Sequence, residues 1–288
     1  MTYRLLKAKE MVSQWQRILK EEVTSLRVIP KLVIFLVGDD VPSQIYTQNK
    51  QRFAHNIGAL CQIVKFPHDV REEDLSKSLL QAAKDKEVHG ILLQLPLPQA
   101  LRHRTSHFIE LIPAAKDVDG LTINSMGQLA KEQHDGLSPC TPRGIITLLK
   151  GYNIPLQGQN VTIIGKGPLV GKPLALELLK LGATVTICHR QTKNLKEHLL
   201  CADIIVLATG QAKFFTADFL PKRDPQRPIT LIDVGIHKLD DNSYCGDVDF
   251  SSVAPLVDNI TPVPGGVGPM TILGLAQNLL QACRQQKS

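Results

Sequence analysis

The sequence of 288 residues is poor in aromatic side chains, which make up 5% of it and include a single tryptophan. It contains no apolar run of the roughly 20 residues that a membrane-spanning helix needs. The polar stretch Met1 to Lys20 also lacks the apolar core of a secretory signal. No run of lysine and arginine exceeds two residues, so a basic surface for nucleic acid is weakly supported. We therefore expect neither membrane nor nucleic acid among its partners.

The six cysteines are too scattered to suggest a shared role. No CxxC pair occurs, and the sequence shows no cluster of residues at the spacing of a metal site. We therefore expect no metal, reduced thiols and a cytoplasmic location. The six are Cys61, Cys140, Cys188, Cys201, Cys245 and Cys283.

The net charge and the length of the chain indicate the class of its ligands and the number of its domains. Its formal net charge of +6 suits anionic small molecules such as phosphorylated cofactors or polycarboxylates. Hydrophobic residues make up 43% and charged residues 21%, which is ordinary for a globular protein. A chain of 288 residues is long enough for roughly two domains, each with its own core.

Apolar runs and amphipathic segments alternate through the first half. The stretch Met1 to Leu26 has helical spacing of its apolar residues and predicts an amphipathic helix. Continuous apolar strands joined by helices are typical of a parallel sheet that is covered on both faces. The predicted strands are 31–37, 59–66 and 90–95, and the predicted helices between them are 42–57 and 71–83.

A second series follows the loop-rich stretch 113–142 and predicts a Rossmann-like dinucleotide-binding domain. The fold class is therefore α/β, with two domains built on parallel sheets. We expect residues 1–139 to form the catalytic domain, completed by a terminal helix over 270–288 that packs back on it, and residues 140–269 to form the second domain. The strands of this series are 161–164, 184–188, 204–208 and 229–234, with helices near 172–181 and 194–201.

The turn after the first strand of this series carries glycines where a pyrophosphate would approach the backbone. Gly165, Gly167 and Gly171 come close to the dinucleotide fingerprint, but the third glycine is one residue late, so an ordinary tight turn remains an alternative. The next strand ends at Arg190 with no acidic residue nearby. Because an acid there would bind a ribose 2′-hydroxyl and an arginine suits a 2′-phosphate, we predict NADP rather than NAD.

Three polar residues of the first domain share one helical face. Ser43, Tyr46 and Lys50 are spaced by three and four positions. A lysine buried near a phenol can lose its proton near neutral pH and serve in acid–base catalysis. The alternative, which fits most such spacings, is a surface lysine beside a core tyrosine.

Two further positions in this domain suggest a ligand. Gln94 stands at the carboxyl end of a predicted strand, where α/β proteins bind their ligands. The loop 116–120 supplies Asp117 and Asp119, and a buried carboxylate can bind an amino-substituted N-heterocycle by two hydrogen bonds. The loop could also be a simple turn.

Prolines and glycines fill the stretch 261–271. Prolines remove N–H donors and glycines permit positive φ, so this run predicts a shaped loop before the terminal helix. Few of its residues carry side chains of any size, which indicates a backbone surface against a flat ligand.

Together these segments resemble the bifunctional methylenetetrahydrofolate dehydrogenase/methenyltetrahydrofolate cyclohydrolase (FolD) family over nearly the whole chain. The resemblance implies NADP as cofactor, a homodimer, a folate cleft between the two domains, and tetrahydrofolate derivatives, including polyglutamylated forms, as substrates. The segments that carry it are 37–40 with Ser43, Tyr46 and Lys50, then 90–98, 116–120, 139–142, 170–173, 233–236, 246–248 and 262–271.

The resemblance also implies roles for individual residues. Lys50 would be the essential lysine, Tyr46 would stack near the pterin, Gln94 would tune Lys50, and Asp119 would hold the pterin ring. Together these four make up the implied catalytic set. The implied folate contacts are Ser43, Tyr46, Gln94, Leu95, Asp119, Pro264, Gly265 and Gly268. The implied cofactor contacts are Gly165, Lys166, Gly167, Val170, Gly171, His189, Arg190, Thr192 and Ile236.

The sequence departs from the common family pattern at a few positions. Lys166 stands where arginine is frequent, Arg190 where serine is frequent, and Ser125 where the family usually has asparagine. The predicted function is oxidation of 5,10-methylenetetrahydrofolate with NADP, followed by hydrolysis of the methenyl product to 10-formyltetrahydrofolate. Two other classes remain alternatives at this point: another NADP oxidoreductase, such as one acting on shikimate, and a non-catalytic nucleotide sensor.

Overall fold

The structure is a computed structural model that describes residues 3–133, 136–220 and 226–286. The chain forms two compact units. Met1–Val12 and Thr141–Thr271 make one, called here the six-stranded unit, and Ser13–Cys140 with Ile272–Ser288 make the other, the three-stranded unit. Among the described residues, no helix is long and apolar enough to cross a membrane.

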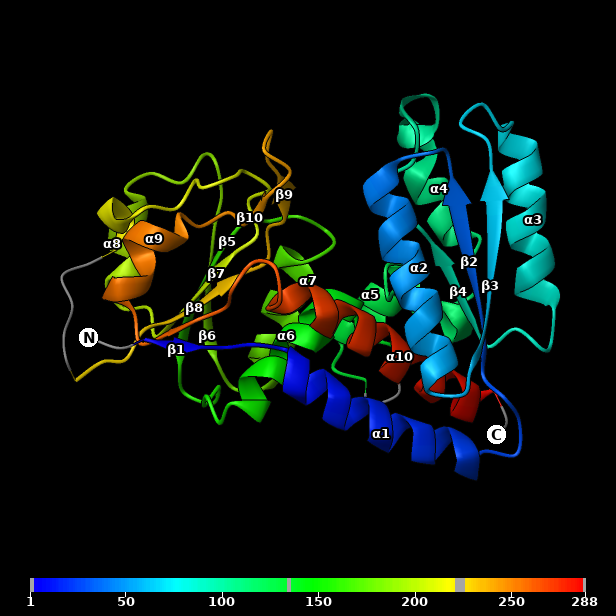
Figure 1. Cartoon of the computed structure of the whole chain (residues 1–288), viewed down its shortest axis with the longest axis horizontal. Coiled ribbons are helices and arrows are strands. Elements are labelled where there is room, and N and C mark those ends of the chain that lie inside the picture. The colour runs from blue at the N-terminus through cyan, green and yellow to red at the C-terminus, as the bar shows by residue number, and fades with distance from the viewer. Residues whose placement is uncertain (1–2, 134–135, 221–225, 287–288) are drawn as a thin grey trace. The chain divides into compact units, whose positions relative to one another are not determined.

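The three-stranded unit is built on a parallel sheet with the strand order β3-β2-β4 (Figure 1). Its strands are β2 (Lys31–Val37), β3 (Leu60–Phe66) and β4 (Gly90–Leu93). The central strand is buried at six of its seven positions, which explains its unbroken run of apolar residues. Because β2 precedes β3 on one side and β4 lies on the other, right-handed crossovers place the two connecting helices on opposite faces.

Those two helices are α2 (Val41–Asn56) and α3 (Glu72–Lys84). Val33 and Phe35 of β2 pack in one cluster with Leu75 and Leu79 of α3. The alternate residues of β2 face the other way, as strand geometry requires, and Leu36 lies beside α2. Helix α2 therefore covers the face of the sheet opposite to α3, and it turns some of its polar residues toward the sheet.

Two regions of this half of the chain differ from the prediction. The segment expected to be one helix from Met1 to Leu26 contains a short strand, β1 (Arg4–Leu5), before α1 (Lys9–Ser25). Residues 1–2 lie outside the described residues. The stretch 113–142, expected to be loop-rich, contains α5 (Ile123–Ala130) and the start of α6 (Cys140–Gly151). Helix α5 begins where the side chain of Thr122 accepts a hydrogen bond from the Ser125 amide, an N-cap that we did not anticipate.

The remaining elements of this unit surround the sheet. Helix α4 (Thr105–Glu110) joins the cluster on the α3 side through Phe108. The terminal helix α10 (Val267–Gln285) belongs to this unit from Ile272 onward, as the predicted return to the first domain requires. Asn278 of α10 donates to the carbonyls of Val118 and Ser138, at 2.8 and 2.6 Å. These bonds fix the predicted ligand loop 116–120 at Val118 and the chain that follows it at Ser138.

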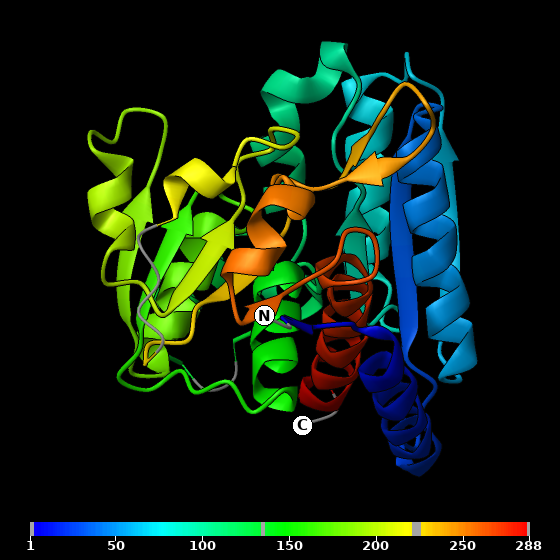
Figure 2. The same cartoon turned by 60° about the vertical axis from the view of Figure 1, so that its left-hand side comes forward.

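The six-stranded unit has a parallel sheet with the order β1-β11-β8-β7-β5-β6, and Figure 2 brings its strands forward. Four strands were predicted: β5 (Asn160–Ile164), β6 (Thr184–Cys188), β7 (Ile204–Leu207) and β8 (Thr230–Asp233). After β5 the chain places β6 on one side of it and β7 on the other. This reversal is the topological switch point of a Rossmann-like sheet, so the α/β class with a dinucleotide-type second sheet is confirmed.

Two strands of this sheet were not predicted because each is only two residues long. β1 pairs in parallel with β11 (Asn259–Ile260), which in turn pairs with β8. Arg4 and Leu5 therefore belong to the sheet of this unit. Its other elements are α7 (Gly171–Lys180), α8 (Leu195–Leu199), α9 (Phe250–Val253) and the antiparallel pair β9 (His237–Lys238) and β10 (Tyr244–Cys245).

Candidate functional site

Lys50 is a buried lysine in the middle of α2. The helix starts at a cap in which Asp40 Oδ2 accepts the amide hydrogen of Ser43 at 2.9 Å, and Pro42 occupies its first turn. Ser43, Tyr46 and Lys50 follow on one face, as their spacing predicts. Lys50 is only 6% exposed, so the alternative of a solvated surface lysine is wrong.

Gln94 holds the Lys50 amine by a direct hydrogen bond. Its Oε1 accepts from Lys50 Nζ at 2.9 Å, while its Nε2 donates to the carbonyl of Leu95 at 2.8 Å. Since both ends of the amide have a partner, its orientation is fixed with the oxygen toward the lysine. The Nζ atom also lies 5.3 Å from the centre of the Tyr46 ring. The structure therefore brings Lys50, Gln94 and Tyr46 into one cluster.

Burial weakens the hold of Lys50 on its proton more than the neighbouring acidic groups strengthen it. Burial lowers the pKa of Lys50, and the nearby Asp119 carboxylate only partly offsets this effect. Burial also raises the pKa of Asp119, against the opposing influence of Lys50. An amine with a lowered pKa beside a carboxyl with a raised pKa makes a site that can accept and return protons.

The two carboxylates of the 116–120 loop have different environments. Asp117 is buried and its oxygens accept from the amides of Gly120 and Thr122 and from the hydroxyl of Ser125, at 2.7 to 3.0 Å. It is a turn residue. Asp119 is partly exposed, which leaves it the one of the two that can meet a ligand. The departure at Ser125 is thus accommodated by a contact with Asp117 and does not reach the cluster.

Cys140 is a neighbour of the cluster to which we assigned no role. Its Sγ lies 3.0 Å from the carbonyl of Val118 and forms a side-chain hydrogen bond with Asp119 that helps to lower the pKa of that carboxyl. Cys61 lies on another side of Lys50, and burial raises its pKa to about 12. The sequence offered one signal for Cys140, its place between two prolines in 139–142. It offered none for Cys61.

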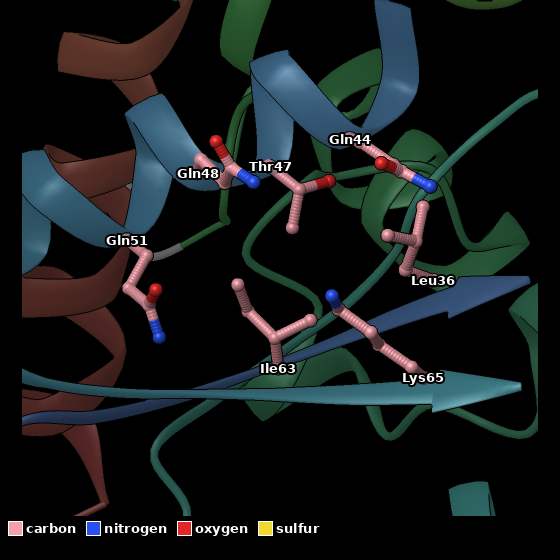
Figure 3. Close-up of a pocket in the computed structure, with 7 residues that line it drawn as sticks. All are labelled: Leu36, Gln44, Thr47, Gln48, Gln51, Ile63 and Lys65. Carbon is pink, nitrogen blue, oxygen red and sulfur yellow. The ribbon is translucent and has the colours of Figure 1, made fainter. Parts of the chain in front are cut away.

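A separate polar pocket of about 280 Å³ lies between α2 and the outer strand β3, and Figure 3 shows its lining. Amide side chains point into it from α2, and Lys65 does so from β3. Lys50, Gln94 and Asp119 do not line it, although its Thr47 hydroxyl reaches Gln94 Oε1 at 3.5 Å. The lining residues are Leu36, Gln44, Thr47, Gln48, Gln51, Ile63 and Lys65.

The turn after β5 in the six-stranded unit fits a dinucleotide. Gly165 has φ +128°, and a side chain there would overlap the Ala208 carbonyl oxygen, so only glycine can occupy this position. A Cβ at Gly167 would meet nothing within 4 Å, which leaves the backbone open to a ligand. Helix α7 then begins without a side-chain cap at Val170. The Lys172 amide donates to the Gly167 carbonyl at 3.1 Å and Pro173 has no N–H, so a pyrophosphate here would meet the positive end of the helix dipole rather than a row of free amides.

Cationic side chains stand beside this turn. Arg190, just beyond β6, and Lys166, in the turn, are both exposed. No hydrogen bond or ion pair of either side chain is found within the described residues. The loop that carries Arg190 is nevertheless ordered, because Thr192 Oγ1 accepts the amide of His189 at 2.8 Å and His189 Nδ1 accepts the amide of Gln191 at 3.2 Å. The residues present can therefore hold a phosphorylated cofactor.

The proline- and glycine-rich loop lies in the six-stranded unit and begins beside β8. Thr261 Oγ1 accepts the amide of Asp233 at 2.7 Å. Gly265 has φ +106°, its carbonyl accepts from the Ala8 amide, and Pro264 is exposed. Helix α10 starts at Val267 and therefore takes in Gly268.

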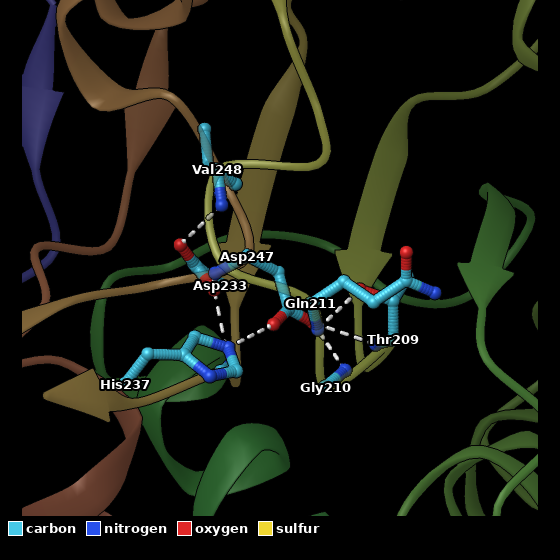
Figure 4. A network of polar contacts seen from close by, with 8 residues as sticks. Thr209, Gly210, Gln211, Asp233, His237, Asp247 and Val248 are labelled. Carbon is cyan, nitrogen blue, oxygen red and sulfur yellow. Dashed lines mark hydrogen bonds and ion pairs between the residues drawn. The ribbon is translucent and has the colours of Figure 1, made fainter. Parts of the chain in front are cut away.

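A network of carboxylates at the ends of β7 and β8 was not anticipated, although both acids stand in segments that carry the resemblance. Asp233 accepts from three backbone amides, and burial raises its pKa to about 6. Asp247 is fully buried and accepts from the amides of Thr209 and Gly210 and from His237 (Figure 4). Ile236, a predicted cofactor contact, is 55% exposed directly beside this network.

Comparison with known proteins agrees over the whole chain. The catalytic domain of the tetrahydrofolate dehydrogenase/cyclohydrolase family matches residues 6–119. The NAD(P)-binding domain of the same family matches residues 139–287. The bifunctional protein FolD of Bacillus cytotoxicus is 39% identical over 284 residues, which are 98% of this chain and 96% of that protein.

Solved structures give the same result. FolD methylenetetrahydrofolate dehydrogenase/cyclohydrolase from Campylobacter jejuni has a TM-score of 0.92 and 35% identity, with 99% of each chain covered. The Trypanosoma brucei enzyme, solved with NADP cofactor and inhibitor, has a TM-score of 0.90 and 28% identity, with 99% of this chain and 98% of that chain covered. These matches exclude the shikimate-type and sensor alternatives. The chain belongs to the tetrahydrofolate dehydrogenase/cyclohydrolase family and is an enzyme with both of these activities.

Proposed function

We propose that Lys50, Tyr46, Gln94 and Asp119 form the catalytic centre of this enzyme. The enzyme oxidises 5,10-methylenetetrahydrofolate to 5,10-methenyltetrahydrofolate with NADP and hydrolyses that product to 10-formyltetrahydrofolate. The observation that carries the proposal is the buried Lys50 amine, bonded to Gln94 Oε1 at 2.9 Å and electrostatically coupled to Asp119. This is the cluster in the three-stranded unit where a lowered lysine pKa meets a raised carboxyl pKa.

Lys50 moves the proton in the hydrolytic step. The methenyl carbon is already cationic, so water can add to it without a metal. The oxygen of water forms the new bond while one of its protons passes to the neutral amine of Lys50. The resulting ammonium then gives its proton to the ring nitrogen as the carbon–nitrogen bond breaks, while the new hydroxyl loses its proton to solvent and its oxygen becomes the formyl carbonyl. Gln94 keeps the amine in position, and because its amide oxygen carries no full negative charge it favours the ammonium form less than a carboxylate would.

The other residues of the centre bind the folate. Asp119 receives the two N–H groups of the pterin edge in a charge-assisted pair of hydrogen bonds. Tyr46 offers its ring for stacking on the folate. Ser43, near the start of α2, and Leu95, just after β4, supply further folate contacts. Pro264, Gly265 and Gly268 supply a backbone surface for the folate. We assign the folate-binding domain to 1–139, completed by 270–288, although Arg4 and Leu5 of this range pair as β1 within the sheet of the six-stranded unit.

NADP binds to the six-stranded unit, which corresponds to the 140–269 domain. The cofactor supplies hydride acceptance at its nicotinamide, and the protein orients it. The pyrophosphate is held at the start of α7 by Gly165, Lys166, Gly167, Val170 and Gly171. The adenosine ribose is received by His189, Arg190 and Thr192. Ile236 lies beside the nicotinamide half of the cofactor.

Arg190→Ala should raise the KM for NADP and leave the KM for NAD almost unchanged. Its guanidinium is exposed and can grip the 2′-phosphate that NAD lacks. Losing a hydrogen-bonded contact to a charged group costs about 1.5–3 kcal/mol, or roughly 10–150-fold in affinity. Steady-state kinetics with each cofactor measure this. Equal losses with NADP and NAD would contradict a 2′-phosphate role, and the cyclohydrolase rate without cofactor should not change.

The partners and location are also part of the proposal. The substrates include polyglutamylated folates, and the protein is a homodimer in the cytoplasm. Exposed apolar side chains support self-association at the outer edge of the three-stranded sheet, namely Val41 and Ile45 on α2 and Leu60 on β3. All six cysteines are free thiols, which suits a reducing compartment. Sedimentation at a mass of one chain would contradict the dimer.

An absorbance assay tests the reactions directly. Methylenetetrahydrofolate with NADP should give the absorbing methenyl intermediate, and methenyltetrahydrofolate alone should lose its absorbance as it is hydrolysed. A protein that bound NADP but formed no methenyl product would contradict the dehydrogenase activity. A protein that formed it without accelerating its decay would contradict the cyclohydrolase activity.

A further inference from the structure

Asp247 ties two loops of the six-stranded unit to each other. Its Oδ2 accepts from the amide of Thr209 at 2.6 Å and from that of Gly210 at 3.1 Å. Its Oδ1 lies 2.8 Å from His237 Nε2. Because an ionised carboxylate can only accept, Nε2 of the histidine carries the proton. The loop after β7 and the loop after β8 therefore share one buried carboxylate (Figure 4).

The backbone that carries the Asp247 carboxylate is held by a second carboxylate, that of Asp233. The amide of Asp247 donates to Asp233 Oδ1 at 2.9 Å, and the following amide, of Val248, donates to Asp233 Oδ2 at 3.0 Å. Side chains at Gly235 or Gly246 would overlap the carboxylates of Asp247 and Asp233 respectively. The site is therefore built around two acids with no spare room. The side chain of His237 is 23% exposed, whereas that of Asp247 is fully buried.

The position of these loops in the sheet tells which part of the cofactor they meet. The strand order is β8-β7-β5-β6, and the switch point lies between β7 and β5. A dinucleotide lies across the switch point, outside the carboxyl ends of the strands. Arg190, beyond β6, lies on the adenosine side. The loops after β7 and β8 lie on the other side, which is where the nicotinamide half must rest.

We propose that His237, acting through Asp247, is a positioning residue that holds the Thr209–Gly210 loop in the shape that receives the nicotinamide half of NADP. The carboxylate needs a donor on each oxygen to keep one orientation. Without His237, Oδ1 loses its side-chain donor in a buried place, and the carboxylate can turn away from the two loop amides. The hydride-transfer reaction needs this loop. Hydrolysis of the methenyl substrate, which uses Lys50 in the other unit, does not.

Two probes separate the halves of the cofactor in a test by calorimetry. NADP contains both halves, whereas 2′,5′-ADP contains only the adenosine half with its 2′-phosphate. We expect His237→Phe, which keeps a ring and removes the donor, to bind NADP about tenfold more weakly or worse, which corresponds to about 1.4 kcal/mol for an unsatisfied buried partner. Affinity for 2′,5′-ADP should equal that of the parent, and so should the cyclohydrolase rate measured without cofactor.

Three variants sharpen the result. His237→Gln retains an N–H donor at a similar reach and should restore NADP binding. His198→Phe makes the same change at an exposed histidine of α8 and should have no effect. If phenylalanine unfolds the unit, His237→Asn removes the contact with a polar side chain that is too short to reach Oδ1. Equal weakening for NADP and 2′,5′-ADP, unchanged NADP affinity, or failure of glutamine to rescue would each overturn the proposal.

Discussion

Replacing Lys50 with methionine should leave a folded protein with almost no cyclohydrolase activity. Methionine keeps an unbranched chain of similar length but cannot accept the proton of the attacking water. General acid–base assistance is worth about 10²–10⁴-fold in rate, so the loss should reach this range. Supplying methenyltetrahydrofolate directly and following its absorbance measures the hydrolytic step alone. Hydrolysis close to the parent rate would remove Lys50 from the mechanism.

Folding is not expected to suffer, because burial already lowers the pKa of Lys50 and makes its charged form unfavourable in the folded state. Lys77→Met, at an exposed position of α3, is a matched control and should keep full activity. The parent rate should also rise with pH as Lys50 loses its proton, with the midpoint of the rise below the value of 10.5 that is usual for a lysine. The methionine variant should lack this limb of the profile.

The sequence predicted the sheets better than the connections between their ends. Apolar runs such as 31–37 and 204–208 agree with β2 and β7 to within one residue, because strands buried on both faces have no polar alternation to obscure them. β1 and β11 were missed because two residues carry no periodic signal and their pairing joins distant parts of the chain. α5 was missed because its eight residues include a glycine and no charged residue, so local propensity gave little sign of a helix.

The candidate site divides in the same way. Helical spacing predicted that Tyr46 and Lys50 share a face, and the end of an apolar run predicted a ligand position at Gln94. Local spacing could not identify functional residues whose partners lie in distant segments of the chain. The bond between Cys140 and Asp119 and the contact of His237 with Asp247 depend on tertiary packing, which no local pattern reports. Local pattern also could not separate Asp117 from Asp119, although their neighbours give them different roles.

Asp119→Ala should weaken folate binding while leaving NADP binding unchanged. The variant loses a charge-assisted pair of hydrogen bonds that only the pterin receives, which is worth about 1.5–3 kcal/mol or roughly 10–150-fold in affinity. Calorimetric titration with folate and, separately, with NADP measures both. Unchanged folate affinity would return Asp119 to the status of a turn residue.

Stability distinguishes this residue from its neighbour in the same loop. Burial raises the pKa of Asp119 above the usual 3.8, so the folded state binds its proton more tightly than the unfolded state does. Ionisation of Asp119 therefore costs folding free energy above the folded-state pKa, and this cost is absent below the unfolded-state pKa. Asp119→Ala should thus not lower the urea midpoint at neutral pH. Asp117→Ala removes an acceptor from Gly120, Thr122 and Ser125, and it should lower that midpoint clearly. A fall of similar size in both variants would mean that Asp119 is held for the fold and not for the substrate.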